Sequence, residues 1–112
     1  MNTRAIGREL EQFIVDTLND IGIKASLSKN SGCSGYNLGD INNNSFIIEA
    51  KYRDTKDLSI KKDVWQKLTE SIPLHSKRMP MYVLGNNEEV FWVIDTDTFK
   101  KIVKGWIEND RK

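Results

Sequence analysis

The sequence lacks several features that would assign it to a particular class of protein. It has one cysteine in 112 residues, so no disulfide can form within the chain, and this suits a reducing compartment. No apolar run is long enough to cross a bilayer. The amino-terminal stretch MNTRAIGREL has no apolar segment of the kind that directs secretion. Together these absences predict a cytoplasmic protein.

An excess of one charge is also missing. The chain has 17 lysines and arginines against 16 aspartates and glutamates, so its net charge of +1 does not mark it as a nucleic-acid-binding protein. Its length predicts one domain, residues 1–112. Between residues 51 and 62, however, five basic residues stand against two aspartates, a local charge of five minus two, or +3. This segment is either a solvated loop or a contact for a polyanion.

Hydrophobic periodicity predicts three helices and five strands. The first helix, residues 3–22, has one apolar arc: Ile6, Leu10, Phe13, Ile14, Leu18 and Ile21. The other helices are expected at about 61–72 and at 98–107, the last one capped by Asp97. The strands are expected at 23–28, 37–42, 45–53, 81–85 and 90–95. This order predicts an α/β fold of the α+β type, in which helices pack on a mixed sheet.

The second half of the chain carries the remaining candidates for the core. In the second helix the inward residues are expected to be Val64, Trp65, Leu68 and Ile72. Three aromatic residues are also assigned to the core in preference to an interface: Phe91, Trp92 and Trp106.

The stretch GDINNNSFIIEAKYR combines an apolar strand with an unusual set of charges. Because alternate side chains of a strand share a face, Glu49 and Lys51 are neighbours on one face, whereas Ile48 and Ala50 lie on the other. A hairpin with a two-residue loop at Asn44–Ser45 would place Asp40 directly opposite Glu49. Two carboxylates that close repel each other unless a cation lies between them. The hairpin therefore predicts a site for a hard divalent ion.

A third acid, Glu11, lies among apolar neighbours on the first helix, between Val15 and Leu18 on a helical wheel. A half-buried glutamate favours a partner such as a metal ion. The chemistry that fits three carboxylates and a lysine is metal-assisted hydrolysis of a phosphodiester. Lys51 would orient the attacking water and add positive charge. Ser31 and Gly32 could present a hydroxyl and backbone N–H groups to a phosphate.

A plainer alternative is that Glu49 and Lys51 form an exposed ion pair of little energetic value. Asp, Glu and Lys are common residues, and the pattern D…ExK on its own is weak. Other polar residues are expected to be ordinary surface residues. His75 follows a helix, Cys33 has no nearby base in the sequence, and the last helix has a basic face formed by Lys100, Lys101 and Lys104.

Taken together, these motifs resemble the PD-(D/E)xK nuclease superfamily, and within it the archaeal-type Holliday junction resolvases and their phage relatives. The resemblance covers about residues 4 to 95. It rests on Gly7 and the glutamate of EQFIVDTL, the Ser-Gly of NSGCSG, Asp40–Ile41, the strand FIIEAK and the glutamine of VWQKL. It implies a single restriction-endonuclease-like domain with a central mixed five-stranded sheet and flanking helices. It also implies a bacterial, archaeal or phage-infected host cell.

The resemblance also implies roles for individual residues. Glu11, Asp40 and Glu49 would bind Mg²⁺, which Mn²⁺ can replace, Lys51 would be catalytic, and Ser31 and Gln66 would be accessory active-site residues. The DNA-binding residues would be Arg4, Arg8, Ser31, Gly32, Arg53, Lys56, Lys61 and Lys62. The expected protein is a homodimer that cuts four-way DNA junctions. The alternatives are a restriction-like or phage nuclease acting on duplex, flap or other branched DNA, and a non-catalytic nucleic-acid-binding or protein-interaction module.

Overall fold

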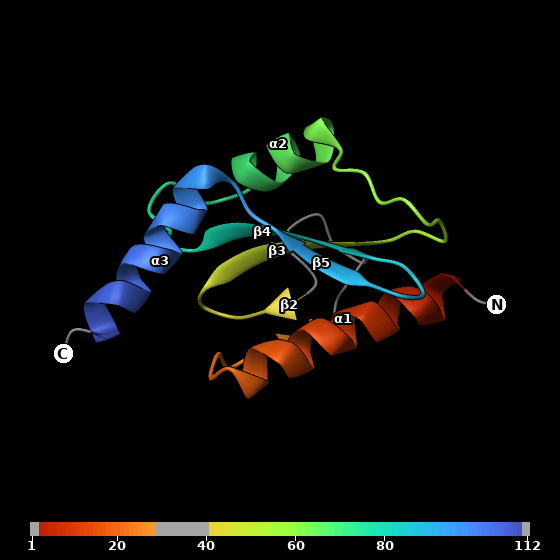
Figure 1. Ribbon diagram of the computed structural model, residues 1–112, viewed down its shortest axis with the longest axis horizontal. Helices are drawn as coiled ribbons and strands as arrows, with labels where there is room; N and C mark the ends of the chain where they lie inside the picture. Colours follow the sequence, from red (N-terminus) through yellow and green to blue (C-terminus); the bar gives the residue numbers. More distant parts are fainter. Residues whose placement is uncertain (1–2, 29–40, 111–112) are drawn as a thin grey trace.

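The computed structural model of the chain describes residues 3–28 and 41–110, with side chains from residue 7 onward in the first helix (Figure 1). Their elements are α1 (Thr3–Asp20), β1 (Ser26–Leu27), β2 (Ile41–Asn42), β3 (Phe46–Tyr52), α2 (Lys62–Glu70), β4 (Met79–Gly85), β5 (Val90–Val93) and α3 (Thr96–Asp110). This order confirms the predicted succession of helices and strands. None of the helices in the described ranges is both long and apolar enough to span a membrane.

The described strands form two small sheets, and the single five-stranded sheet that was expected is not confirmed. In the larger sheet β4 lies in the middle, parallel to β3 and antiparallel to β5. The parallel pair is joined through α2, as parallel neighbours require a crossover connection. The smaller sheet pairs β1 with β2, so the α+β class is confirmed but one continuous sheet is not.

The predicted hairpin between the strands at 37–42 and 45–53 does not form within the described residues. Ile41 pairs with Leu27 of β1, whereas the prediction paired Ile41 with Ile48. The asparagine turn itself is present, because the Asn43 side-chain oxygen accepts the N–H groups of Ser45 (2.9 Å) and Phe46 (2.6 Å). The turn leads the chain from the smaller sheet into the larger one and does not fold one strand back on the other.

The core lies on both faces of the larger sheet, with α1 on one side and α2 on the other (Figure 1). Against α1, the buried side chains of Ile14 and Leu18 pack with those of Ile48 and Val83. On the α2 side, the buried residues are Ile47, Leu68, Tyr82 and Leu84. The alternation predicted for β3 is therefore confirmed, since even-numbered apolar residues face α1 and Ile47 faces α2.

The buried face of α1 is rotated from the predicted arc. Leu10, Ile14 and Leu18 are buried as expected, and Val15 is buried with them. Phe13 was expected inside but is 48% exposed; Ile21 was also expected inside but follows the end of the helix and is 68% exposed. The rotation brings the buried stripe toward the side of the helix that carries Glu11. In α2 the prediction is confirmed, because Leu68 is buried and three further residues pack on the same cluster: Val64, Trp65 and Ile72.

The last helix and the aromatic residues require two further corrections. α3 is capped by Asp95 and not by Asp97, because Asp95 Oδ1 accepts the Thr98 N–H at 3.0 Å. Asp97 instead lies inside the first turn of the helix. Of the three aromatic residues assigned to the core, Trp92 packs against it in part. Phe91 and Trp106 are exposed, so that assignment is wrong for both.

Candidate functional site

Glu49 and Lys51 are positioned by β3, a strand whose apolar residues are buried at its start. In the parallel pairing Glu49 lies opposite Tyr82 and Lys51 opposite Leu84, and both partners belong to the cluster on the α2 side. The two charged side chains extend this face toward the carboxyl end of β3. Lys51 Nζ lies 3.2 Å from Glu49 Oε1, which confirms that they are neighbours on one face. The pair is partly open to solvent, with Lys51 36% and Glu49 37% exposed.

Glu11 belongs to the helix that covers the other face of the sheet. It is half-buried on α1, and α1 packs on the face of β3 that carries Phe46 and Ile48. Glu49 and Lys51 lie on the opposite face. β3 is an edge strand of its three-stranded sheet, so a site shared by Glu11 and Glu49 would have to straddle that edge. In the ranges 3–28 and 41–110 no three residues of the types His, Cys, Asp and Glu are grouped so that they could hold a metal ion.

Several predicted site residues lie outside the described residues: Ser31, Gly32 and Asp40. The same is true of Cys33, and of the side chain of Arg4. The predicted opposition of Asp40 and Glu49 rested on the hairpin register. The neighbouring residues Ile41 and Asn42 pair with β1, so this register gives the opposition no support.

Gln66 was expected to be an accessory active-site residue, but it is exposed on α2. On a helical wheel it lies on the far side of the helix from Leu68 and Ile72, which pack on the sheet. Its side chain therefore points away from the face that carries Glu49. The predicted DNA contacts with described side chains are all exposed: Arg8, Arg53, Lys56, Lys61 and Lys62. His75 is exposed as well.

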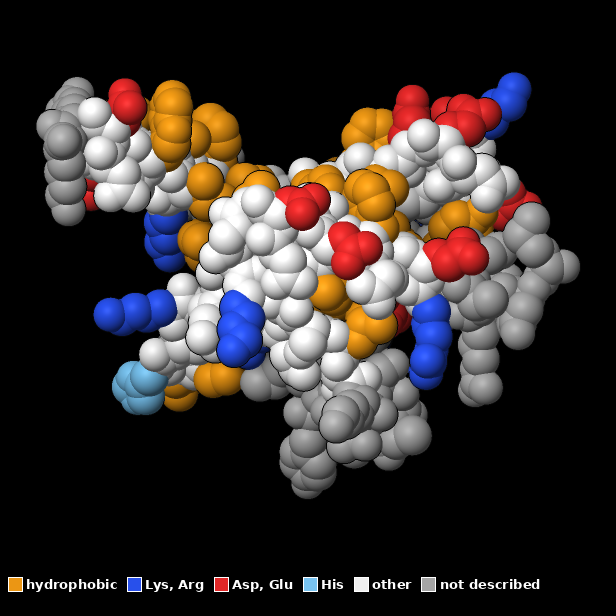
Figure 2. Space-filling model, turned by 90° about the horizontal axis from the view of Figure 1, so that it is seen from below, with side chains coloured by type: hydrophobic (Ala, Val, Ile, Leu, Met, Phe, Trp, Pro, Cys, Tyr) orange, Lys and Arg blue, Asp and Glu red, His pale blue; other side chains and the backbone are white. Residues whose placement is uncertain are grey.

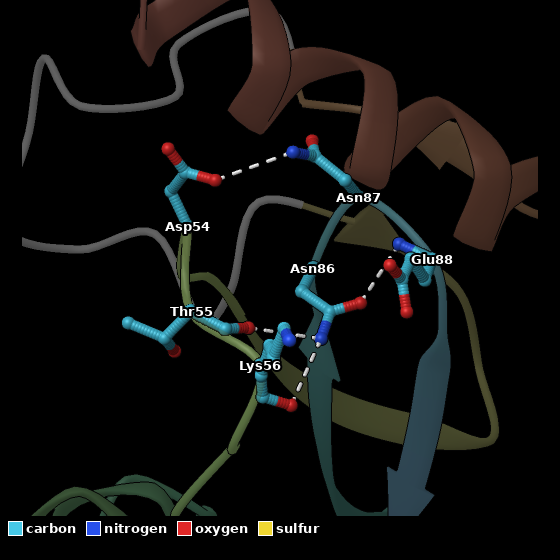
Figure 3. A pocket seen from close by; sticks show the side chains of 6 residues that line it. All are labelled: Asp54, Thr55, Lys56, Asn86, Asn87 and Glu88. Carbon is cyan, nitrogen blue, oxygen red and sulfur yellow. Dashed lines mark hydrogen bonds between the residues drawn. The ribbon is translucent and has the colours of Figure 1, made fainter.

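Two asparagines that the sequence did not single out organise the loop after Lys51. Asn86 Nδ2 donates to the backbone carbonyls of Thr55 (3.0 Å) and Lys56 (3.4 Å) (Figure 3). Its Oδ1 accepts the N–H groups of Glu88 (2.9 Å) and Glu89 (2.7 Å). These contacts hold the segment after β3 against the β4–β5 turn around a small cavity of about 150 Å³. The signal was available, because Gly-Asn-Asn between two apolar runs is typical of a turn.

Asn87 links the same two segments through side chains. Its amide nitrogen donates to Asp54 Oδ1 at 3.2 Å, and its oxygen accepts the Tyr52 hydroxyl. Loss of solvent contact raises the pKa of Tyr52, and the negative charges of Asp54 and Glu9 raise it further. Tyr52 therefore remains a neutral hydrogen-bond donor at physiological pH. The loop that carries Arg53 and Lys56 is thus fixed at the carboxyl end of β3, next to Lys51.

Comparisons with known proteins identify no relative. No family model matches the chain, and no curated protein or solved structure is detectably similar to it.

Proposed function

We propose that the chain is a Mg²⁺-dependent endodeoxyribonuclease of the PD-(D/E)xK type, acting as a homodimeric Holliday junction resolvase. The observation that supports this best is the Glu49–Lys51 pair. An acid and a lysine lie side by side near the carboxyl end of a strand that is otherwise apolar, and both are accessible from solvent. The proposal includes a finer fold, in which the strands of both small sheets belong to one five-stranded mixed sheet.

The donor chemistry at Glu49 fits a hard divalent ion, because its carboxylate is accessible and supplies oxygen ligands. Glu49 and Asp40 would hold the ion, with Glu11 as a third ligand across the edge of β3. When bound, the ion supplies Lewis acidity and lowers the pKa of a water molecule. Lys51 would orient the nucleophile and offset negative charge that develops on the phosphate. Ser31 would assist as an accessory residue, whereas Gln66 has no role in this proposal because its side chain points away from the face that carries Glu49.

The surface beside Lys51 suits a polyanion. Arg53 and Lys56 follow in the loop that Asn86 fixes, and Lys61 and Lys62 lead into α2. Their exposed cationic groups would contact phosphates along the DNA backbone, and Arg8 with Arg4 would add contacts from α1. Contacts to phosphates position the DNA without reading its sequence, which is the behaviour expected of an enzyme that recognises branched structure.

Two observations favour a second candidate, a nucleic-acid-binding module without catalysis. Glu11 comes from the helix on the opposite face of the sheet, and Lys51 already has a partner in Glu49. A nuclease that cuts duplex or flap DNA remains the closest alternative within the same chemistry. Two measurements separate these alternatives from the resolvase. The binding module would cut no DNA, and the duplex or flap nuclease would cut DNA without preferring a four-way junction.

The decisive experiment is a cleavage assay with labelled mobile four-way junction, flap and linear duplex over a Mg²⁺ titration, repeated with Mn²⁺. We expect metal-dependent cutting of the junction in preference to the duplex, and loss of cutting in Asp40→Asn and Lys51→Ala. Lys77→Ala is the matched control, because Lys77 precedes the amino end of β4, at the opposite end of the parallel pair from Lys51. Equal cutting of junction and duplex would remove the resolvase assignment. If folded protein binds DNA but cuts none of the substrates, the binding module replaces the nuclease.

A further inference from the structure

The larger sheet has two edge strands, β3 and β5, because β4 lies between them. Among the described strands, β4 alone pairs with β5. Figure 1 shows the sheet with β5 in front of β4, α1 below it and α2 above it. Backbone N–H and C=O groups along a free strand edge can pair with a further strand. β5 therefore presents a position at which the sheet can be extended.

The hydrogen bonds of β4 show which main-chain groups of β5 face outward. The Gly85 carbonyl accepts the Arg53 N–H at 2.9 Å, so the main-chain groups of Gly85 face β3. Val90, which lies opposite Gly85 in the ladder, is therefore not hydrogen-bonded to β4. Because bonded and non-bonded pairs alternate along an antiparallel ladder, the N–H and C=O groups of Val90 and Trp92 point away from the sheet.

β5 also lacks the features that usually protect a free strand edge. Such edges commonly carry charged residues, a proline or a bulge. Val90–Val93 reads VFWV and pairs with β4 in an unbroken register, so it has none of these. β3, the opposite edge, carries Glu49 and Lys51. An apolar edge strand of this kind favours pairing with another chain.

An apolar groove of about 430 Å³ lies along the same strand. Its apolar lining residues are Leu58, Ile60, Leu84, Phe91 and Val93. The groove is on the α2 side of the sheet, because Phe91 lies opposite Leu84, which belongs to the α2-side cluster. At the rim, Ile60 is 57% and Phe91 49% exposed. A strand added to β5 would project every second side chain onto this side, where apolar residues would meet exposed apolar surface.

Acidic residues stand at both ends of β5. Glu89 directly precedes the strand, and Asp95 follows it and lines a neighbouring cavity of about 210 Å³. With Asp57 and Lys56 of the groove, the local charge is three minus one, or −2. Figure 2, whose upper border is the front of Figure 1, shows hydrophobic side chains in a hollow of that border and acidic side chains on the rim away from α3. A partner with a cation at each end of an apolar stretch of about 20 Å complements this edge in either strand direction.

We propose that β5 is a docking edge for an extended segment of a partner protein, apolar at alternate positions and with a lysine or arginine at each end. The segment pairs with the outward N–H and C=O groups of Val90 and Trp92, and its apolar side chains cover Ile60 and Phe91. Main-chain hydrogen bonds supply the affinity, and the groove with its acidic ends supplies the selectivity. The docking edge is independent of the nuclease chemistry, since it uses none of the residues proposed to bind metal or to catalyse cleavage.

The test is amide hydrogen exchange, measured by NMR on the full chain without DNA or metal. The probe is a peptide of about seven residues with blocked ends, a lysine at each end and alternating valine and threonine between them. We expect the Val90 and Trp92 amides to exchange rapidly in the free protein and at least about tenfold more slowly with saturating peptide. The Phe91 and Val93 amides face β4 and should exchange slowly in both states. Slow exchange of Val90 and Trp92 in the free protein would overturn the proposal, because another part of the chain or a second copy would then cover the edge.

A substitution at Val90 removes the main-chain contact alone. Val90→Pro deletes an N–H that does not bond to β4, at the first residue of an edge strand, where proline is tolerated. Val90→Thr is the matched control, because it keeps this N–H and a β-branched side chain. We expect Val90→Pro to weaken peptide binding at least about tenfold and Val90→Thr to change it by less than about threefold. Circular dichroism verifies that both variants fold.

Two altered peptides test the same contact from the other side, and they decide the question if Val90→Pro does not fold. A peptide N-methylated between its lysines cannot donate main-chain hydrogen bonds and should bind at least about tenfold more weakly. A peptide with glutamate in place of both lysines should bind at least about fivefold more weakly. No binding of the lysine peptide, or equally tight binding of either altered peptide, would overturn the proposal. Because DNA cleavage is not measured, failure here leaves the proposed function standing, and failure of cleavage leaves the docking edge standing.

Discussion

Lys51 Nζ lies 3.2 Å from Glu49 Oε1 on a strand whose first three residues are buried. An ion pair that is about one third exposed contributes at most about 1 kcal/mol to the free energy of unfolding. Apolar side chains at these two positions would extend the cluster of Ile47, Tyr82 and Leu84 instead. The pair contributes little to stability, so the proposed catalytic role can be tested separately from the fold.

Lys51→Ala and Glu49→Gln should leave the fold intact and remove cleavage. Each loses a weak surface interaction, so we expect the free energy of unfolding to change by less than about 1 kcal/mol. Cleavage should fall by about 10²-fold or more, as when a charge-stabilising group is removed from an active site. Chemical denaturation and a junction-cleavage assay measure the two effects on the same preparations. Retained cleavage in either folded variant would contradict the site, and a loss of several kcal/mol would assign the pair a structural role.

The face of α1 gives a second prediction. Ile14 of α1 is fully buried, whereas Ile21, the residue after the last residue of that helix, is 68% exposed. Ile14→Ala should lower the free energy of unfolding by about 2–5 kcal/mol, because it removes buried methyl groups and leaves a cavity. Ile21→Ala should change it by no more than about 0.5 kcal/mol. Urea denaturation of the two variants decides between the observed core and the predicted arc, which extended the helix to residue 22 and made both residues part of the core.

The turn before β3 gives a third prediction. The Asn43 side chain accepts two backbone N–H groups, from Ser45 and from the buried Phe46. Asn43→Ala leaves both donors without this partner, and we expect a loss of about 1–3 kcal/mol in the free energy of unfolding. Asn44→Ala is the control, since Asn44 is exposed and should be nearly neutral. Thermal melts of both variants provide the comparison, and equal losses would show that the acceptor contacts of Asn43 do not matter.

The local elements could be predicted from the sequence because their signals are local. The apolar run Phe46–Ile47–Ile48 predicted β3, and the alternation of its side chains placed Glu49 beside Lys51. The helical wheel placed Glu11 beside the residues that form the buried stripe of α1. An asparagine run indicated a turn, and Asn43 makes one through its side chain.

Partners that are distant in the sequence could not be predicted in the same way. β3 pairs with β4, so that Phe46 lies beside Met79, and no local pattern encodes that contact. The turn at Asn43 was compatible with a hairpin, but the main-chain groups of Ile41 pair with β1 instead. Periodicity also does not reveal which face of the sheet a helix covers. In the folded chain α1 covers the face of β3 opposite to Glu49, so Glu11 and Glu49 lie on opposite sides of the sheet. Exposure of Phe91 and Trp106 is likewise a tertiary property.

The amino end of α3 shows the same limit of sequence-based prediction, because the sequence does not reveal which residue caps the helix. Asp95 and Asp97 are both suitable caps, and the choice between them is made by geometry, because Asp95 Oδ1 accepts the Thr98 N–H at 3.0 Å. Asp95→Ala should therefore lower the free energy of unfolding by about 1 kcal/mol. Asp97→Ala should cost only a few tenths of a kcal/mol, since it loses only the favourable effect of an acid in the first turn. Equal losses in thermal melts of the two variants would contradict the assignment of the cap.

The same cap predicts how stability depends on pH. Hydrogen bonds from the Thr98 side chain and then its backbone N–H lower the pKa of Asp95 in the folded protein below its ordinary value of 3.8, against the opposing effect of burial. A group whose pKa is lower when folded stabilises the folded state above its unfolded pKa, and this contribution is lost as the pH falls through the folded pKa. Asn caps a helix as well as Asp but does not titrate. The free energy of unfolding of the wild type minus that of Asp95→Asn should therefore be constant above about pH 5 and should fall below about pH 4, where only the wild type loses stability. Denaturation curves collected across this range measure this signed difference, and a value that stays constant or rises toward low pH would show that Asp95 is not held as a carboxylate.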